Sequence, residues 1–545
     1  MYPHLDRGTL GPIIKYEEDL VRLRRLVASQ RRRIVEENTK RRELISWAPR
    51  IIKQGAWDPI SDPVSLDGAP SLPMPVEFAE PESLAPFLQH LAVNGKVPNV
   101  STIDNGTTVS ITEPYYQTPA IEFERGVEYS DGRMDLCKMV LGPRNIAALM
   151  DSLKTNQSVT HFLLGNNIIG PSGAKCIADF LKEFRNRMDT WYLAGNCIDG
   201  PSLRLLVDEW VNSTSVTNIW LKRNPLGPAA AGDIFQLVTQ TDNLRTLDLD
   251  QTELGDAGVT ELFNKLAVHD RPIALRHIYL NAVGVGEKAA GAIAKYLASP
   301  LCELAALYAS NNPLGDAGVA ALAHGLKVNT SLTRLTLASV GVNDAGIIAL
   351  CNALEKHPSL VTLDIGQSYS TEDLEARYNW VTDHSASSLH SFVASSQKLA
   401  YLNLSQCAMT NIGLSTLLEA VSNSPTLLFY RAIKIWPQGR DPVAIHAGQQ
   451  HAKLAEQAHA NVLKNIQRTY GDNFTHEKFL TEHKRWLVND KTDVRKIDSV
   501  YRNRDAGLAR RGLKTLDKWW DENNQQTLKE AMGAVGPVCT MRKNK

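Results

Sequence analysis

The sequence lacks the features that mark membrane, secreted and metal-binding proteins. It contains no run of 18 apolar residues, so no membrane span is expected. Its first residues lack the apolar stretch and the small-residue cleavage site of a signal peptide. Only seven of its 545 residues are cysteine, and they are dispersed without metal-ligand spacing. We therefore expect a cytoplasmic protein with reduced, mostly buried thiols.

Catalytic motifs are missing as well. Residues 170–176 contain Gly and Lys, but their spacing does not match a phosphate-binding loop and fits a turn instead. There is no His-Glu-x-x-His and no Gly-x-Ser-x-Gly. The C-terminal region offers one cysteine, Cys539, as a nucleophile, which is a weak basis for a ligase activity. We predict no catalytic residues, no metal and no cofactor, and we expect a protein that is not an enzyme.

What the sequence does contain is a repeat between about residue 136 and residue 432. Each copy has apolar residues at positions one, four and six, and often Asn at position nine. In a short strand, positions four and six face the same side. Asn at position nine is predicted to satisfy the backbone groups of the turn that follows; it is present as Asn167, Asn196, Asn224 and Asn312, and Ser368 stands there in a later copy. The copies begin at residues 136, 159, 188, 216, 244, 275, 304, 332, 360, 399 and 427.

The second half of each copy predicts a helix. Asp256, Asp316 and Asp344 each precede an apolar-periodic run, and we predict that each carboxylate caps the helix that follows it. Alternating strands and helices with one fixed period stack into a solenoid. The predicted fold is an α/β horseshoe of about 10–11 repeats, with an inner parallel β-sheet, outer helices and helical N- and C-terminal flanks.

A repeat of about 28 residues with one helix per copy resembles the ribonuclease-inhibitor type of leucine-rich repeat. Ran GTPase-activating proteins and the repeat domains of NOD-like receptors share that superfamily. The resemblance covers about 300 of the 545 residues and implies a fold and a protein-binding role. The missing phosphate-binding loop argues against an intact NOD-like receptor. The basic end, Met541–Lys545, differs from the acidic tail of the Ran GTPase activators, and no functional residue of theirs is carried over.

Four regions follow from these patterns. Residues 1–55 form a basic helical segment, with one helix over 12–46, and residues 56–130 form a Pro-rich linker or N-terminal cap with a short helix at 81–92. The solenoid occupies 131–440. Residues 441–545 form a helical region that caps the last repeat, or alternatively a separate effector domain. Its candidate helices are 444–468, 475–488 and 513–532, and its candidate anchors on the last repeat are Trp486, Trp519 and Trp520.

Charge is distributed unevenly along the chain. Residues 1–53 carry 13 Lys/Arg and 7 Asp/Glu, residues 440–545 carry 20 and 13, and the middle carries 26 and 39. Solvated helical faces explain this pattern most simply. The alternative is that the basic ends dock on the acidic solenoid or on an acidic partner. Arg31–Arg33 leaves nuclear localisation open, but we do not expect nucleic acid as a partner.

The concave face is the predicted binding surface. Strand positions three, five and seven should point into it, and adjacent strands lie about 4.8 Å apart. Tyr192 and Trp220 should be neighbours, as should Tyr279 and Tyr308, with Asp248 and Asp250 between the two pairs. Aromatic and charged side chains together are typical of interface hot spots. The predicted partner-binding residues are Tyr192, Trp220, Lys222, Asp248, Asp250, His277, Tyr279, Asn281, Tyr308, Ser310, Arg334 and Asp364.

Two other interpretations of these side chains remain open at this point. The aromatic residues could only pair across strands, or a flank of the chain could fold into the groove and cover them. A further feature is the interval of 39 residues from Leu360 to Leu399, whose excess lies within residues 368–384. This insertion is predicted either to contact a partner or to form a longer connection.

The function predicted from the sequence is a monomeric scaffold that binds a partner protein on its concave face. One alternative is a Ran-type regulator that activates a small GTPase. The other is a secreted pathogen or symbiont effector that uses the repeats to bind a host protein.

Overall fold

The computed structural model describes residues 47–71, 78–97, 103–104, 108–112, 118–437, 439–499 and 501, with the two short strands before residue 118 described by their backbone alone. All of these except Tyr501 belong to one compact unit, Trp47–Ser499. The helices predicted at 12–46 and 513–532, and the anchors Trp519 and Trp520, lie outside the described residues.

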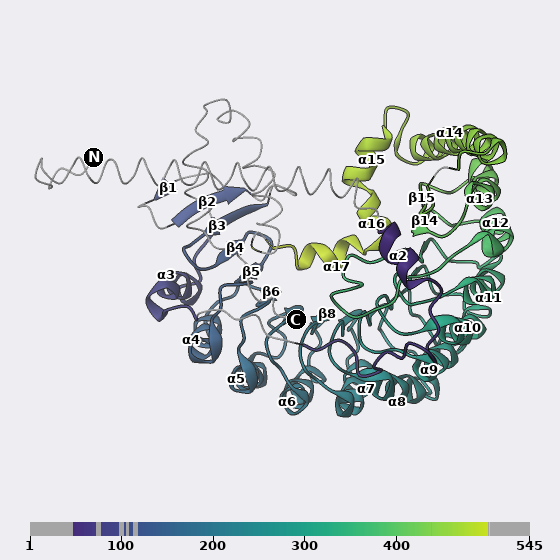
Figure 1. Ribbon diagram of the computed structural model, residues 1–545. Helices are drawn as coiled ribbons and strands as arrows, with labels where there is room; N and C mark the ends of the chain where they lie inside the picture. Colours follow the sequence, from purple (N-terminus) through teal and green to yellow (C-terminus); the bar gives the residue numbers. More distant parts are fainter. Residues whose placement is uncertain are drawn as a thin grey trace, which may run out of the picture. The chain divides into compact units, whose positions relative to one another are not determined.

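One 15-stranded sheet runs through this unit, with the strands paired in chain order (Figure 1). Every pair from β5 onward is parallel. The predicted parallel solenoid is therefore confirmed. Its strands are β5 (Arg133–Asp135), β6 (His161–Leu163), β7 (Thr190–Tyr192), β8 (Asn218–Trp220), β9 (Thr246–Asp248), β10 (His277–Tyr279), β11 (Ala306–Tyr308), β12 (Arg334–Thr336), β13 (Thr362–Asp364), β14 (Tyr401–Cys407) and β15 (Phe429–Lys434).

A helix follows each of these strands on the outer side of the curved sheet (Figure 1). Apolar residues of the strands, such as Leu247 and Leu249, and of the facing helices form one continuous buried core. The helices are α4 (Gly142–Lys154), α5 (Gly170–Phe184), α6 (Gly200–Trp210), α7 (Ala231–Gln240), α8 (Gly255–Ala267), α9 (Glu287–Leu297), α10 (Gly315–Leu326), α11 (Asp344–Leu354), α12 (Ala386–Ser395) and α13 (Asn411–Asn423), with 3-10 turns η1 (Pro228–Ala230) and η2 (Asp383–Ser385) before α7 and α12.

The first repeat begins earlier than the sequence pattern predicted. Met134 pairs with Phe162 and Asp135 with Leu163, so the residue at strand position five is Asp135 and not Val140. The copy therefore starts at residue 131 instead of 136. Its apolar residues Met134 and Leu136 take positions four and six, and both are fully buried. The predicted register was wrong because Leu136, Met139 and Leu141 imitate the motif five residues too late.

The asparagines at position nine satisfy backbone groups of turns, as predicted, and many of these groups belong to the preceding repeat, a link that was not predicted. Asn312 accepts hydrogen bonds from the amides of Val283, Gly284 and Val285, and donates to the carbonyl of Leu280. In the copy beginning at Leu360 this role belongs to Asn379 and not to Ser368. Asn379 donates to the carbonyls of two repeats and is fully buried. The insertion therefore precedes the asparagine of its repeat.

The aspartates at the helix starts act across repeats, which corrects the predicted capping. The carboxylate of Asp256 accepts the amides of Gly286 and Ala289 at the start of α9, not those of its own helix. Asp316 likewise accepts the amides of Asn343 and Gly346 at the start of α11. Stacked helices place their N-termini side by side, so a carboxylate in one first turn reaches the free amides of the next.

The N-terminal flank closes the first repeat with more structure than a linker. The helix predicted at 81–92 is present as α3 (Pro81–Ala92), next to α4. The strands β1 (Ile103–Asp104), β2 (Thr108–Thr112), β3 (Pro119–Glu122) and β4 (Val127–Tyr129), which were not predicted, extend the sheet in antiparallel pairs up to β5. Asn145 and Asn156 donate to the carbonyls of Ala79 and Leu91, which fixes this flank to α4 and its following turn.

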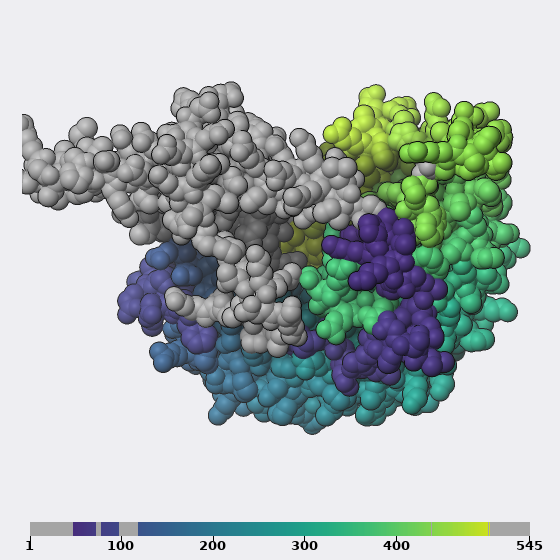
Figure 2. Space-filling view, viewed as in Figure 1, coloured from purple at the N-terminus to yellow at the C-terminus, as the bar shows by residue number. Residues whose placement is uncertain are grey.

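Residues Trp47–Ser71, called here the rim segment, begin with α2 (Ala48–Gln54) and run along the turns that follow the strands. Trp57 is buried against Gly341 and Gly315, and Ser71 hydrogen-bonds Gln251 and Glu253. The segment thus crosses from later to earlier repeats, and Figure 2 shows it in purple against the solenoid.

The C-terminal flank begins with a long helix and continues in three short ones. α14 (Pro442–Tyr470) packs on α13, and its Asn461 and Asn465 donate to the carbonyls of Ser424 and neighbouring residues. The helix predicted over 475–488 is split into α15 (His476–Glu482) and α16 (Lys484–Val488), and α17 (Lys491–Lys496) follows. Trp486 stacks with Arg485 of its own segment.

Candidate functional site: the concave face

The aromatic side chains at strand position five form one row. The ring centroids of Tyr192 and Trp220 lie 6.3 Å apart, and those of Tyr279 and Tyr308 are stacked at 4.1 Å, which confirms both predicted pairs. The rings of Trp220 and Tyr279 also meet at 5.2 Å, across the intervening strand of Asp248. The two predicted pairs are therefore one continuous row. Burial raises the pKa of Tyr308 to about 12, so its hydroxyl stays protonated and can donate.

Side chains at position seven form a series of hydrogen bonds, each to a backbone amide of the next repeat. Asp250 accepts the amide of Asn281, Asn281 accepts the amide of Ser310, and the hydroxyl of Ser310 accepts the amide of Ala338. Lys222 pairs with Asp250 at 3.1 Å, and this carboxylate raises the pKa of Lys222. Each step joins one repeat to the next, so these residues support the sheet as well as lining the groove.

Residues Lys484–Ser499, called here the concave segment, cross the sheet from its last strands to its first (α16 and α17 in Figure 1). Near the middle, Asp493 is buried, with its carboxylate 2.6 Å from Nδ1 of His277 and accepting the hydroxyl of Thr246. Burial raises the pKa of Asp493, but the hydrogen bonds from His277 and Thr246 outweigh it and lower the pKa to about 2. A charged carboxylate is thus held by strand position three.

A cationic contact lies one helical turn further along α17. The ammonium of Lys496 is 2.8 Å from the carboxylate of Asp189, and it also donates to Thr217 and Asn218. His161 lies 3.3 Å from the same carboxylate of Asp189, on its other oxygen. The segment then ends on the first repeat, where the hydroxyl of Ser499 donates to the buried Asp135.

The other end of the concave segment is held through its backbone. The hydroxyl of Tyr308 donates to the carbonyl of Val488, and Arg334 and Thr362 donate to the carbonyl of Leu487. The ammonium of Lys484 lies 4.2 Å above the ring of Phe429 on the last strand. The segment therefore touches strands from both ends of the sheet.

The structure brings the twelve predicted residues onto one face but leaves them unequally accessible. Three of them, His277, Tyr308 and Arg334, contact the concave segment directly, so the interpretation in which a flank covers the groove describes part of the face. The buried members are Tyr192, Trp220, Asp248, Asp250, His277, Tyr279 and Tyr308, and the half-buried ones are Lys222, Asn281, Ser310, Arg334 and Asp364.

Several residues of this face were missed in the sequence. Asp189 precedes its strand and Asp135 lay outside the predicted register, while Asp493 and Lys496 belong to a helix without repeat character. The register error alone concealed Asp135. The other three carry no local signal, because a charged residue just before a strand or on a short polar helix is an ordinary solvated feature.

The insertion after β13 contacts the chain itself. Arg377 forms a two-pronged ion pair with Asp62 of the rim segment, and the side-chain amide of Gln54 donates to the backbone carbonyl of Tyr378 and accepts its amide. Trp47 and Tyr369 meet edge to face at 5.5 Å. The insertion thus binds the rim segment. Tyr369 of the insertion is nevertheless 86% exposed, so a contact between the insertion and a partner protein stays a prediction.

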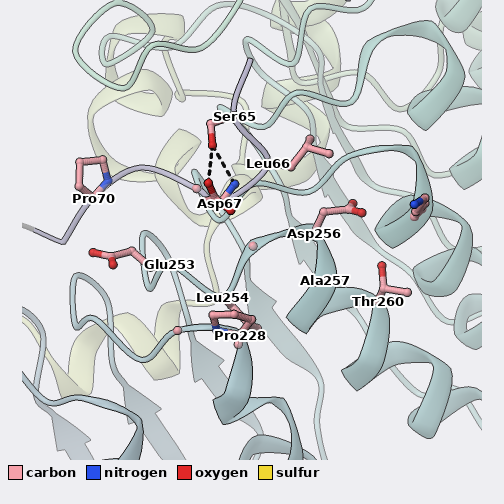
Figure 3. A pocket seen from close by; sticks show the side chains of 14 residues that line it. Ser65, Leu66, Asp67, Pro70, Pro228, Glu253, Leu254, Asp256, Ala257 and Thr260 are labelled. Carbon is pink, nitrogen blue, oxygen red and sulfur yellow. Dashed lines mark hydrogen bonds between the residues drawn. The ribbon is translucent and has the colours of Figure 1, made fainter. Parts of the chain in front are cut away.

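A cavity of about 690 Å³ lies between the rim segment and the turns of two repeats (Figure 3). Ser65 and Asp67 of the rim segment hydrogen-bond each other beside the cavity, and Glu253 and Asp256 come from the turn after β9 and the first turn of α8. The amide of Asp256 is already occupied by the carbonyl of Leu66. The lining is largely apolar, and its charged members are Asp67, Glu253, Asp256 and Lys288.

Within the described ranges, no group of three or more His, Cys, Asp or Glu side chains has the arrangement of a metal site. None of the helices in the described part of the chain combines the length and the hydropathy that crossing a membrane requires. Of the six cysteines in the described ranges, four are buried, and burial raises the pKa of Cys407 to about 12.

Comparisons with known proteins agree with this architecture. The model of the family described as "Leucine Rich repeat" matches residues 243–263, 328–351 and 395–418. The chain is 26% identical over 202 residues to "NACHT, LRR and PYD domains-containing protein 5" of Mus musculus, covering 32% of the chain and 16% of that protein. It is 32% identical over 152 residues to protein 12 of that series from Mus musculus, covering 28% and 14%.

A third relative is smaller. The chain is 28% identical over 196 residues to "Ribonuclease inhibitor" of Sus scrofa, covering 36% of the chain and 42% of that protein. Each match thus spans less than half of the relative's own length. Together with the parallel sheet and the outer helices, the matches identify repeats of the ribonuclease-inhibitor type.

Proposed function

We propose that this leucine-rich-repeat protein of the ribonuclease-inhibitor type is a scaffold without enzymatic activity that binds another protein on its concave face. The observation that carries the proposal is that this face already receives a polypeptide segment. Side chains of strands β9 to β13 hydrogen-bond the backbone and the carboxylate of the concave segment, which lies outside the repeats.

The accessible part of the face supports binding as well. Lys222, which follows β8, and Asp364, on β13, lie on different repeats of this face, and both remain half-buried, so a partner can reach each of them, Lys222 beside its ion pair with Asp250. Because the aromatic row spans several repeats, a partner would contact residues that are distant in sequence but fixed by one rigid sheet.

The test compares two full-length double variants in affinity capture from a native lysate. Lys222→Ala/Asp364→Ala removes one cation and one anion from the concave face. The matched control, Lys182→Ala/Glu261→Ala, removes one of each from the exposed outer helices. We expect a protein that is captured by wild type and by the control and is lost with the concave variant. Equal capture by all three would contradict the proposal.

The identity of the captured protein then decides between the finer hypotheses. A small GTPase would favour a regulatory role, which is checked by measuring whether the purified protein accelerates GTP hydrolysis. Capture from one host lysate and not from those of other organisms would favour an effector that acts on that host.

A further inference from the structure

The two helices of the concave segment contribute few buried side chains, although Leu487 and Val488 pack half-buried against the core and Ile497, directly after α17, is buried. In α16 no residue is buried, and in α17 only Asp493 is. By contrast, α8 buries seven residues in the solenoid core. Helices of five and six residues have little stability of their own in water. Opening of the segment should therefore cost far less free energy than unfolding of a repeat.

Its geometry suits a helix laid across parallel strands. Three residues of an α-helix rise about 4.5 Å, close to the spacing of about 4.8 Å between adjacent strands. Successive turns of such a helix meet successive repeats. Asp493 accordingly contacts Thr246 on β9, and Lys496, three residues later, contacts Asn218 on the neighbouring β8.

The sheet places complementary groups at these two positions. On one side, His277 and Thr246 present donors to a carboxylate, with Nδ1 of His277 at 2.6 Å. On the other side, Asp189 faces an ammonium at 2.8 Å. A helix with a carboxylate followed three residues later by an ammonium satisfies both, provided that it runs from later to earlier repeats. The reversed order of charges would bury like charges against each other.

We propose that the concave segment is a displaceable internal ligand, and that the partner protein presents a helix with Asp or Glu followed three residues later by Lys, which replaces it on the sheet. This inference rests on the proposed function and specifies the partner's chemistry. Binding at this site requires the segment to open first, so the affinity measured for a partner is lowered by the fraction of molecules that are closed.

The probe is a fluorescein-labelled peptide with the sequence of residues 484–499, titrated with full-length proteins by fluorescence anisotropy. The variant Asp493→Ala/Lys496→Ala weakens the internal ligand and leaves its receptor groups intact. We expect it to bind the probe at least tenfold more tightly than wild type does. A matched variant on exposed positions of the same helix, Lys491→Ala/Thr492→Ala, should bind the probe as wild type does.

Two further arms test the recognised chemistry. A probe with alanine in place of Asp493 and Lys496 should not bind the variant Asp493→Ala/Lys496→Ala. Adding Asp189→Asn and His277→Asn to that variant should abolish binding of the unchanged probe. Equal probe binding by wild type and the weakened variant would overturn the proposal, as would tight binding of the alanine probe.

Hydrogen exchange on the wild-type protein keeps the proposal testable if a variant misfolds. Amides of Lys491–Ile497 should exchange at least a hundredfold faster than those of α8, and equal protection would overturn the proposal. Failure here is distinct from failure of the proposed function. If capture of a partner is lost with Lys222→Ala/Asp364→Ala but is unchanged with Asp493→Ala/Lys496→Ala, the proposed binding function stands and the displaceable segment is rejected.

Discussion

The rim segment and the concave segment both lie on the solenoid, but they are held by different forces. The rim segment buries Ile51 and Trp57 and lies against glycines of the repeat turns. The concave segment buries one apolar residue, Ile497, and its other contacts are made by Asp493, Lys496 and backbone carbonyls. Apolar burial is insensitive to pH and salt, whereas charged contacts respond to both. We therefore expect the rim segment to be a permanent part of the fold and the concave segment to be a reversible contact.

Removing the main apolar anchor of the rim segment should give the largest effect. Trp57→Ala should lower the free energy of unfolding by ~4 kcal/mol, because a large buried ring is replaced by a cavity. Urea denaturation followed by circular dichroism measures it. Ile60→Ala, at a position 91% exposed, is the control and should leave stability unchanged. If Trp57→Ala lowered the free energy of unfolding only slightly, the rim segment would also be a reversible contact.

A matched pair of glycines separates close packing from backbone strain. Gly341 and Gly227 both have positive φ, 70° and 71°, but a Cβ at Gly341 would lie 2.2 Å from the ring of Trp57, and none of the described atoms lies within 4 Å of one at Gly227. Gly227→Ala should cost ~1 kcal/mol from strain, and Gly341→Ala ~3 kcal/mol from strain plus overpacking. Equal costs in thermal unfolding would mean that Trp57 yields easily.

Acid should release the concave segment and spare the rim segment. The pKa of Asp493 is lowered from 3.8 to about 2, so its contribution is complete above pH 3.8 and is lost as the pH falls towards 2. The expected loss is ~2 kcal/mol of attachment, detected as faster hydrogen exchange of α17. In Asp493→Asn this dependence should vanish between pH 4 and 2. A variant that keeps the same dependence would assign it to other carboxylates.

The smallest effect is expected at the ion pair of the rim segment. Arg377 and Asp62 are partly exposed, so Arg377→Ala should cost only ~0.5 kcal/mol despite the two-pronged geometry. Denaturation at low and at high salt measures the difference. A cost as large as that of Trp57→Ala would show that charge, and not apolar burial, holds this segment.

The repeat fold could be predicted because its period is visible in most copies. Positions such as Ile278 and Leu280 must face the core once the strand register is known, and the aromatic row follows from the same register. Asn379 could also have been found. Asn379, Val381 and Asp383 repeat the pattern of Asn312, Leu314 and Asp316, displaced by the insertion.

The concave segment could not be predicted in the same way. The contact of Asp493 with His277 joins residues 216 positions apart, and that of Ser499 with Asp135 joins residues 364 positions apart. Neither has a periodic signal, because each is a single polar pair formed only after both partners are placed by the fold. The sequence also does not reveal which helix the aspartates at the helix starts cap. The same residues are required whether an aspartate caps its own helix or the next one.

The cross-repeat caps give the solenoid a direction. Asp256 caps the helix of the following repeat, and Asn312 satisfies carbonyls of the preceding one, so the polar groups of a repeat are complete only when its successor is present. During synthesis from the N-terminus, each repeat would therefore become stable one repeat after it emerges. In the described part of the chain no repeat follows the one that begins at Leu427, and Asn461 and Asn465 of α14 donate to carbonyls at its start instead. The hydrogen bonds from α14 thus take the place of those that a further repeat would make.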